Sequence, residues 1–195
     1  APPALPAKAG LSVAFEPWPN AAALVGPPAQ YTGLAALDVD NDRDVDLVLT
    51  RENAPGLVVL NERLGVFRST EAPEINAGGL VVTDLDKDGR SDLVRVGTSG
   101  PATALRNTTQ PPASAWAAWP SSVPAWRSAV AADLDLDSWP DLIGLPVKGG
   151  RPLGWARSDG ATLSETPLAV GPFPVGVSRL AGFALADAVG DGRPD

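Results

Sequence analysis

The 195-residue sequence contains no cysteine and no histidine. Without cysteine the chain has no disulfide bond, no thiol nucleophile and no cysteine-ligated zinc site. Without histidine it has no Ser–His–Asp triad, no histidine-ligated metal and no histidine general base. It also has a single tyrosine, Tyr31. The chain is therefore poor in the side chains that most enzyme active sites use.

Long apolar runs and clusters of basic residues are missing as well. No apolar stretch approaches the ~18 residues that a membrane-spanning helix needs, so no membrane span is expected. The basic residues are scattered without a stripe, which gives no support for nucleic-acid binding. The 20 glycines and 21 prolines break helices, and helical periodicity is not sustained anywhere. Short strands joined by turns are expected instead.

One acidic motif is repeated along the chain. It reads DVDNDRDVDLV at 38–48, DLDKDGRSDLV at 84–94, DLDLDSWPDLI at 133–143 and DAVGDGRPD at 187–195. The first aspartates of the four copies are 46, 49 and 54 residues apart. A period of this size is typical of a solenoid or a propeller.

The residues around each copy predict a four-stranded unit. An apolar run follows the first three copies, and two more short runs separated by Gly- or Pro-containing turns complete each unit. Four short strands in about 45–50 residues are typical of a β-propeller blade. The expected fold is therefore all-β, a partial propeller ring of about three to four blades.

The repeat also predicts the boundaries of these units. Residues 1–30 are expected to form a linker and the outer strand of a preceding blade. Blades are expected at 31–76, 77–125 and 126–178, and the truncated start of a fourth at 179–195. Because the fourth unit is incomplete, we expect the chain to be part of a longer protein.

The net charge of −8 is confined to the repeated motif. Sixteen of the 23 acidic residues lie in its four copies, and the other seven are outnumbered by 15 lysines and arginines. Two carboxylates ~4 Å apart repel by roughly 1 kcal/mol in water and by several at a protein surface. A compact loop with four such groups therefore needs a cation, and oxygen ligands without nitrogen or sulfur favour Ca²⁺.

The spacing suggests how such a loop holds an ion. Carboxylates at positions 1, 3 and 5 can point inward, while a carbonyl at position 7 and a carboxylate at position 9 complete the shell. The candidate metal ligands are Asp38, Asp40, Asp42, Asp44 and Asp46; Asp84, Asp86, Asp88, Arg90 and Asp92; Asp133, Asp135, Asp137, Trp139 and Asp141; and Asp187, Asp191 and Asp195, with Arg90 and Trp139 acting through their carbonyls.

The motif has two other possible interpretations. An EF-hand needs a Glu at position 12, where this chain has Leu49, Arg95 and Gly144, so that interpretation fails. The motif could also be an acidic β-turn without metal, since Asp favours turns. Aspartate at positions 1, 5 and 9 of every copy favours the metal.

The pattern D-x-D-x-D-G-x-x-D followed by an apolar strand, together with GLVVLNERLGVFRST at 56–70, resembles the FG-GAP/VCBS repeat family of integrin-α-like propeller blades. The resemblance implies Ca²⁺ in the loop between the first two strands of each blade. Arg43 and Ser138 replace the motif's glycine, so their loops are expected to bend differently. Val189 replaces the third-position acid, so the fourth site is expected to be the weakest.

The resemblance also implies a location and a function. Extracellular calcium modules bind at about 10⁻⁴–10⁻³ M, which places the protein outside the cytoplasm, whether secreted, periplasmic or on the cell surface. We expect a non-catalytic binding or scaffold module for a protein or glycan partner. The alternatives are the propeller portion of a polysaccharide lyase or dehydratase, and a structural subunit of a surface assembly. The remainder of a longer chain or other copies of this one are further expected partners.

Two further features have a structural and a functional interpretation. Three of the six tryptophans, Trp116, Trp119 and Trp126, lie between the second and third units. They are expected to pack between blades rather than to form a platform for sugar rings. The triplet NTT at 107–109 is a glycosylation sequon.

Overall fold

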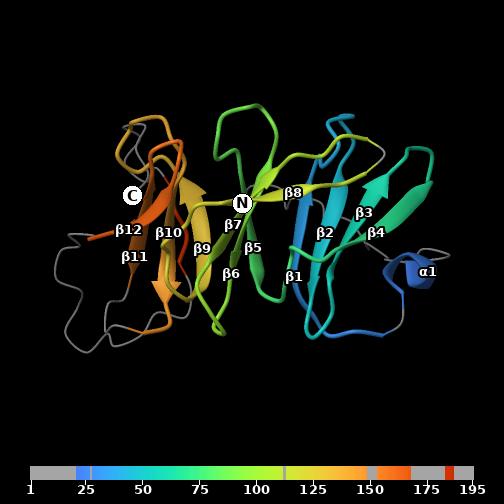
Figure 1. Cartoon of the computed structure of the whole chain (residues 1–195), viewed down its shortest axis with the longest axis horizontal. Helices are drawn as coiled ribbons and strands as arrows, with labels where there is room; N and C mark the ends of the chain where they lie inside the picture. Colours follow the sequence, from blue (N-terminus) through green and yellow to red (C-terminus); the bar gives the residue numbers. More distant parts are fainter. Residues whose placement is uncertain (1–20, 27, 112, 149–152, 168–182, 187–195) are drawn as a thin grey trace, which may run out of the picture.

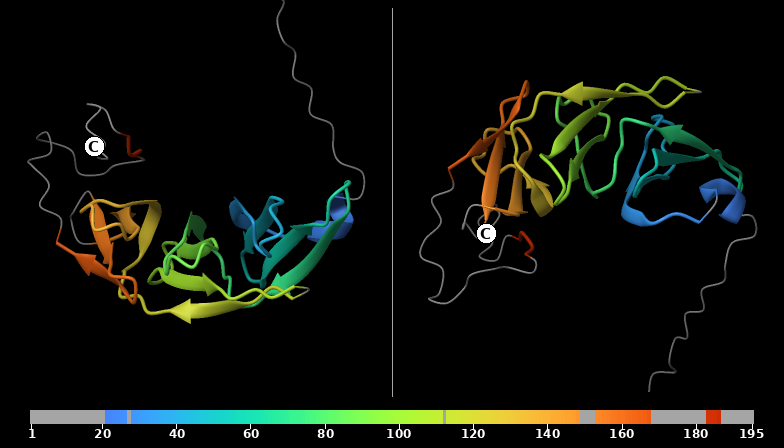
Figure 2. Two further views of the ribbon diagram at one scale, coloured as in Figure 1. Left: turned by 90° about the horizontal axis from the view of Figure 1, so that it is seen from above. Right: turned by 60° about the horizontal axis from the view of Figure 1, so that its bottom comes forward.

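The computed structural model describes residues 21–26, 28–111, 113–148, 153–167 and 183–186. Within them, three antiparallel sheets of four strands stand side by side in a curved row (Figures 1 and 2). Each sheet has the strand order of the sequence, which is the meander of a propeller blade. The prediction of an all-β chain made of four-stranded blades is confirmed.

Each blade consists of four consecutive strands. Blade 1 contains β1 (Tyr31–Leu37), β2 (Asp46–Arg51), β3 (Gly56–Asn61) and β4 (Phe67–Ala72); blade 2 contains β5 (Gly79–Thr83), β6 (Asp92–Val96), β7 (Thr103–Asn107) and β8 (Trp116–Trp119); blade 3 contains β9 (Trp126–Ala132), β10 (Asp141–Pro146), β11 (Gly154–Ser158) and β12 (Leu163–Thr166). One short helix, α1 (Ala21–Val25), lies near β4.

The second strand of each blade is largely buried, since it has a neighbouring strand on both sides. All five residues of β6 are buried, and so are the first five of β10. A continuous apolar run, rather than a strict alternation of apolar and polar residues, is the sequence pattern of such a strand. The motif therefore joins a partly exposed acidic loop directly to a largely buried strand.

The core lies between the blades rather than within one sheet. One hydrophobic cluster packs Val48, Val58 and Leu60 of blade 1 against Leu93 and Leu105 of blade 2. A second cluster fills the space between blades 2 and 3 in the same way. Because each blade buries a face against its neighbour, the blades stabilise one another as in other repeat proteins.

The three tryptophans near the boundary of blades 2 and 3, in β8 and at the start of β9, are part of these cores. Trp116 belongs to the first cluster and Trp126 to the second, and Trp119 packs against the second. Trp126 is fully buried, and a Cβ added at Gly144 of β10 would lie 2.3 Å from its Cε3 atom. The structural interpretation of these three residues is confirmed.

Polar contacts across the blade boundary fix how blade 2 sits on blade 1. The Nδ2 group of Asn107, at the end of β7, donates to the carbonyl of Val39 at 2.9 Å. Asn107 and Val39 are both fully buried. A glycan on Asn107 is therefore incompatible with the folded chain. The asparagine of the sequon instead joins blades 1 and 2 through a buried hydrogen bond.

Two predicted segments lie outside the described residues. They are the strand expected before residue 20 and the fourth copy of the motif with Asp187, Asp191 and Asp195.

Candidate metal centres

The three described copies of the motif form equivalent loops between the first two strands of their blades. Loop 1 comprises residues 38–45, loop 2 residues 84–91 and loop 3 residues 133–140. All three lie at the same end of the blades, the upper end in Figure 1. Antiparallel pairing of the flanking strands brings the two ends of each loop together, as in the pairs Leu37–Asp46 and Thr83–Asp92.

The loops share one backbone conformation. The fourth and sixth positions are left-handed in all three loops, with φ of 63° and 74° at Asn41 and Arg43, 56° and 85° at Lys87 and Gly89, and 61° and 75° at Leu136 and Ser138. The expectation that loops 1 and 3 bend differently is therefore wrong. The loops adopt the same turn although a non-glycine residue in this region costs roughly 1 kcal/mol.

Hydrogen bonds from the loop backbone to its own carboxylates explain the shared turn. The first aspartate of each loop accepts the N–H of the sixth residue: Asp38 from Arg43 at 2.9 Å, Asp84 from Gly89 at 3.0 Å and Asp133 from Ser138 at 2.8 Å. The aspartate at position 5 accepts the N–H of the residue at position 7 in the same manner. These local bonds, which Asp forms readily, hold the turn whichever side chain occupies position 6.

The aspartate at position 9 of each described motif is hydrogen-bonded to the backbone of the sheet. Asp92 accepts the N–H of Leu85, in loop 2, and the N–H of Asn107, at the end of β7, both at 2.7 Å. Asp46 and Asp141 make the equivalent pairs of bonds in their blades. All three side chains are buried. The ninth aspartate therefore ties the acidic loop to the third strand of its blade, a role that the sequence did not reveal.

Burial governs the protonation of these aspartates. Desolvation raises the pKa of Asp92 to about 6, although its two backbone hydrogen bonds act in the opposite direction. Burial raises the pKa of Asp46 and of Asp141 as well. Carboxylates buried in this way hold their charge at a cost that a nearby cation would offset.

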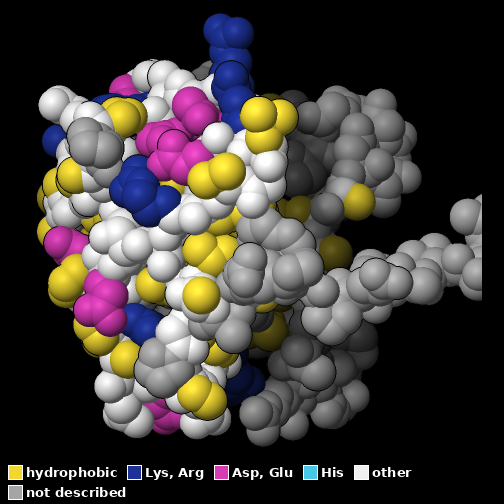
Figure 3. Space-filling view, turned by 90° about the vertical axis from the view of Figure 1, so that its right-hand side faces the viewer, with side chains coloured by type: hydrophobic (Ala, Val, Ile, Leu, Met, Phe, Trp, Pro, Cys, Tyr) yellow, Lys and Arg dark blue, Asp and Glu magenta, His cyan; other side chains and the backbone are white. Residues whose placement is uncertain are grey.

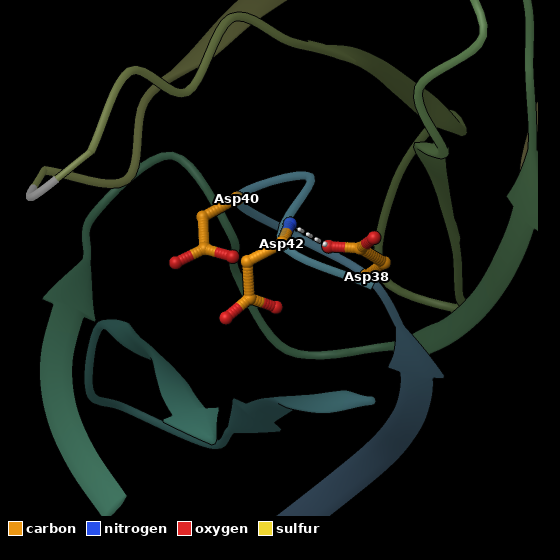
Figure 4. A group of neighbouring side chains, drawn as sticks. All are labelled: Asp38, Asp40 and Asp42. Atoms are coloured by element: carbon orange, nitrogen blue, oxygen red, sulfur yellow. Dashed lines mark hydrogen bonds between the residues drawn. The ribbon is translucent and has the colours of Figure 1, made fainter. Parts of the chain in front are cut away.

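The structure brings three carboxylates together in each loop. Ligand oxygens of Asp38, Asp40 and Asp42 lie within 4.8 Å of one another (Figure 4), as do those of Asp84, Asp86 and Asp92, and those of Asp133, Asp135 and Asp137. Positions 1 and 3 contribute in every loop, and the third member is position 5 in loops 1 and 3 and position 9 in loop 2. The other predicted carboxylates, Asp44, Asp46, Asp88 and Asp141, lie outside these trios.

One carboxylate oxygen in each trio is buried from solvent and has no hydrogen-bond partner among the described residues. These atoms are Oδ1 of Asp40, Oδ1 of Asp84 and Oδ1 of Asp133. Burial, and next the carboxylate of Asp42, raise the pKa of Asp40. A shielded, unpaired carboxylate oxygen beside two other carboxylates is a poor arrangement unless a cation joins them. The trios offer only hard oxygen donors, so the residues present fit Ca²⁺.

Arginines from other parts of the blade contact the same loops. Arg157, on β11, bonds Asp135 at 2.5 Å and Asp137 at 2.7 Å. Arg106, on β7, lies 3.4 Å from Asp86, and Arg63 pairs with Asp44. Figure 3 shows acidic side chains gathered near the upper end of the blade 1 side, next to basic ones. Sequence reasoning missed these arginines because they lie about 20 residues from the acids they contact.

Loops 2 and 3 also touch each other. The Nζ of Lys87 lies 4.1 Å from the ring centroid of Trp139. A Cβ added at Gly160 would lie 2.5 Å from the same ring. The indole is therefore held between the neighbouring loop and the β11–β12 turn of its own blade, and it is only partly exposed.

Repeated antiparallel blades, each with an acidic loop in its first hairpin, define a repeat protein of the β-propeller class. The model of the FG-GAP-like repeat matches residues 38–95 and 84–144, which together span more than half of the 195 residues. The chain belongs to the FG-GAP-like repeat family. No curated protein matches it. Among the described residues, no helix has the length and apolar character needed to cross a membrane.

Proposed function

We propose that loops 1, 2 and 3 each bind one Ca²⁺ and that the ions stabilise a non-catalytic, extracytoplasmic binding or scaffold module. The observation that carries the proposal is the unpaired, solvent-shielded carboxylate oxygen in each of the three trios. Three equivalent loops with the same backbone turn argue against accidental clustering of acids.

The residues that would hold the ions are the members of the trios. They are Asp38, Asp40 and Asp42 in loop 1, Asp84, Asp86 and Asp92 in loop 2, and Asp133, Asp135 and Asp137 in loop 3. Asp88 and the carbonyls at the seventh position are further candidates by their spacing. A bound ion supplies positive charge that cancels the repulsion among the carboxylates, so the acidic loop and the buried strand after it are stabilised together.

Calcium titration of the metal-free chain tests the proposal. A ligand that binds only the folded state stabilises it by roughly 1.4 kcal/mol per site at a tenfold excess over its dissociation constant. Three sites, each at a tenfold excess over its own dissociation constant, are therefore expected to add about 4 kcal/mol to the free energy of unfolding in urea. Mg²⁺ is expected to do less, because it demands a more rigid octahedral shell.

Two variants with the same charge change give a matched comparison. Asp84→Asn removes a carboxylate from the trio in loop 2, whereas Glu165→Gln removes one from the exposed surface of β12. The first is expected to lose one site in isothermal titration calorimetry, and the second is expected to keep all of them. Identical urea curves for the wild-type chain with and without Ca²⁺ would refute the proposed function.

The proposed location follows from the calcium affinity of such loops. A loop site of about 10⁻⁴–10⁻³ M affinity fills at extracellular calcium concentrations and stays empty in the cytosol. The proposed partner is a protein or a glycan. Glycan-array binding of the calcium-loaded chain that disappears with EDTA would support the glycan partner. Turnover of a uronate polymer would instead favour a lyase.

A further inference from the structure

The three acidic loops differ in how much positive charge the protein itself supplies to the trio. In loop 3, Nε and Nη2 of Arg157 bond two of the three trio members, Asp135 and Asp137. In loop 2, a single trio member, Asp86, has an arginine partner, at a distance of 3.4 Å. The backbone turn is the same in each loop and does not account for this contrast.

Of the three described loops, loop 1 has the fewest ion pairs between its trio and the protein's own cations. Its arginine, Arg63, pairs with the carboxylate of Asp44, which lies outside the trio, and reaches Asp42 only through the main-chain oxygen. Within the described residues, no lysine or arginine forms an ion pair with the carboxylates of Asp38, Asp40 or Asp42. All three carboxylates of the loop 1 trio are therefore without an ion-pair partner from the described part of the protein.

The arginines of loops 2 and 3 occupy the same place in their blades. Arg106 precedes Asn107 and Arg157 precedes Ser158, whose N–H groups bond the ninth aspartate. The corresponding residue in blade 1 is Leu60, which is buried in the core. In blades 2 and 3 the side chain at this position of the third strand brings a guanidinium to the trio beside it, and in blade 1 it does not.

We infer that Arg157 is an affinity-setting residue that competes with Ca²⁺ for Asp135 and Asp137, so that loop 1 fills at a lower calcium concentration than loop 3. The inference rests on the proposed calcium binding. An incoming ion must share the two carboxylates with the guanidinium or displace it. The free energy of two exposed ion pairs of ordinary strength corresponds to about a tenfold change in the dissociation constant for Ca²⁺.

The matched variants are Arg157→Gln and Arg127→Gln. Both remove one positive charge from blade 3, and glutamine keeps a hydrogen-bonding side chain. Arg127 is on β9 at the end opposite to loop 3, where it bonds the carbonyl of Pro146 at 3.3 Å. Arg157 is 45% exposed, so its replacement is expected to leave the core intact.

Calorimetric calcium titrations of the full metal-free chain, at one fixed ionic strength, test the inference. Arg157→Gln is expected to tighten one class of sites by about tenfold, and Arg127→Gln to leave all dissociation constants within about twofold. Adding Asp133→Asn to Arg157→Gln is expected to remove the gain, which assigns it to loop 3.

Urea unfolding of the metal-free chains provides a second measurement. Without Ca²⁺, Arg157→Gln is expected to unfold at lower urea than the wild-type chain, because Asp135 and Asp137 lose their compensating charge. With saturating Ca²⁺ the difference is expected to shrink or reverse. If Arg157 only supports the fold, its replacement would destabilise the chain equally with and without Ca²⁺. That result would overturn the inference.

The outcomes separate this inference from the proposed function. Calcium binding by the wild-type chain with an unchanged isotherm for Arg157→Gln would overturn the inference alone. Equal tightening by Arg127→Gln would also overturn it, since the effect would then follow net charge. No calcium binding by the wild-type chain would overturn the proposed function and the inference together.

Discussion

Replacing Asn107 with alanine is expected to loosen the contact between the first two blades. The Nδ2 group of Asn107 donates to the buried carbonyl of Val39, and its Oδ1 accepts the N–H of Thr109 at 3.0 Å. Both partners are at least 95% buried, with Val39 at 0% and Thr109 at 5% exposure. Asn107→Ala leaves these two polar groups without a partner and without water.

The size of the effect follows from those two groups. A buried donor or acceptor left unpaired costs about 1–3 kcal/mol, so Asn107→Ala is expected to lower the free energy of unfolding by about 2–6 kcal/mol. That is a large part of the 5–15 kcal/mol typical of a domain. Since Val39 is the second residue of loop 1, the loss also reaches the acidic loop of the neighbouring blade.

Asn61 provides the matched control because it occupies the same place in blade 1. Its Nδ2 group lies 3.5 Å from the carbonyl of Val45, and its Oδ1 accepts the N–H of Arg63 at 3.2 Å in an exposed setting. Water can replace these partners, so Asn61→Ala is expected to cost less than about 1 kcal/mol. Urea unfolding followed by tryptophan fluorescence measures both variants. Equal, small losses for the two would refute the role given to Asn107.

Two further predictions concern the core and the buried aspartate. Gly144→Ala is expected to cost about 1–3 kcal/mol because its Cβ would lie 2.3 Å from an atom of Trp126, whereas Gly100→Ala, with no atom within 4 Å of its Cβ, should be nearly neutral in the same thermal melts. Burial raises the pKa of Asp92 from 3.8 to about 6, so in metal-free buffer the folded state binds this proton more tightly than the unfolded state. The corresponding stability is present below about pH 4 and is lost as the pH rises through about 6, and the difference between urea midpoints of the wild-type chain and Asp92→Asn across this range measures it.

Much of the blade architecture could be predicted from the sequence. The repeat of the acidic motif and the apolar runs behind it indicated four-stranded units, because strand pairing in a meander joins neighbouring segments. The position of the acidic loops between first and second strands followed from the same pattern. Residues such as Asp38 and Asp84 could be named as candidates because their loops close through hydrogen bonds within six residues.

The partners of the loop side chains could not be predicted in the same way. The spacing indicated that the aspartate at position 9 completes the ion's shell, but it did not indicate that Asp46, Asp92 and Asp141 are also hydrogen-bonded to the third strand of their blades. The bend expected at Arg43 and Ser138 was wrong, since the first aspartate fixes the turn through the backbone.

The sequence by itself determined the blades, the loops and the places of the acidic groups, because these depend on local periodicity and on short-range hydrogen bonds. Only the tertiary structure decided which polar and charged side chains contact each other. Arg157 reaches Asp135 across a sheet, and Asn107 reaches Val39 across a blade boundary. Such contacts depend on how sheets stack and on which strand ends lie together, and no spacing along the chain specifies either.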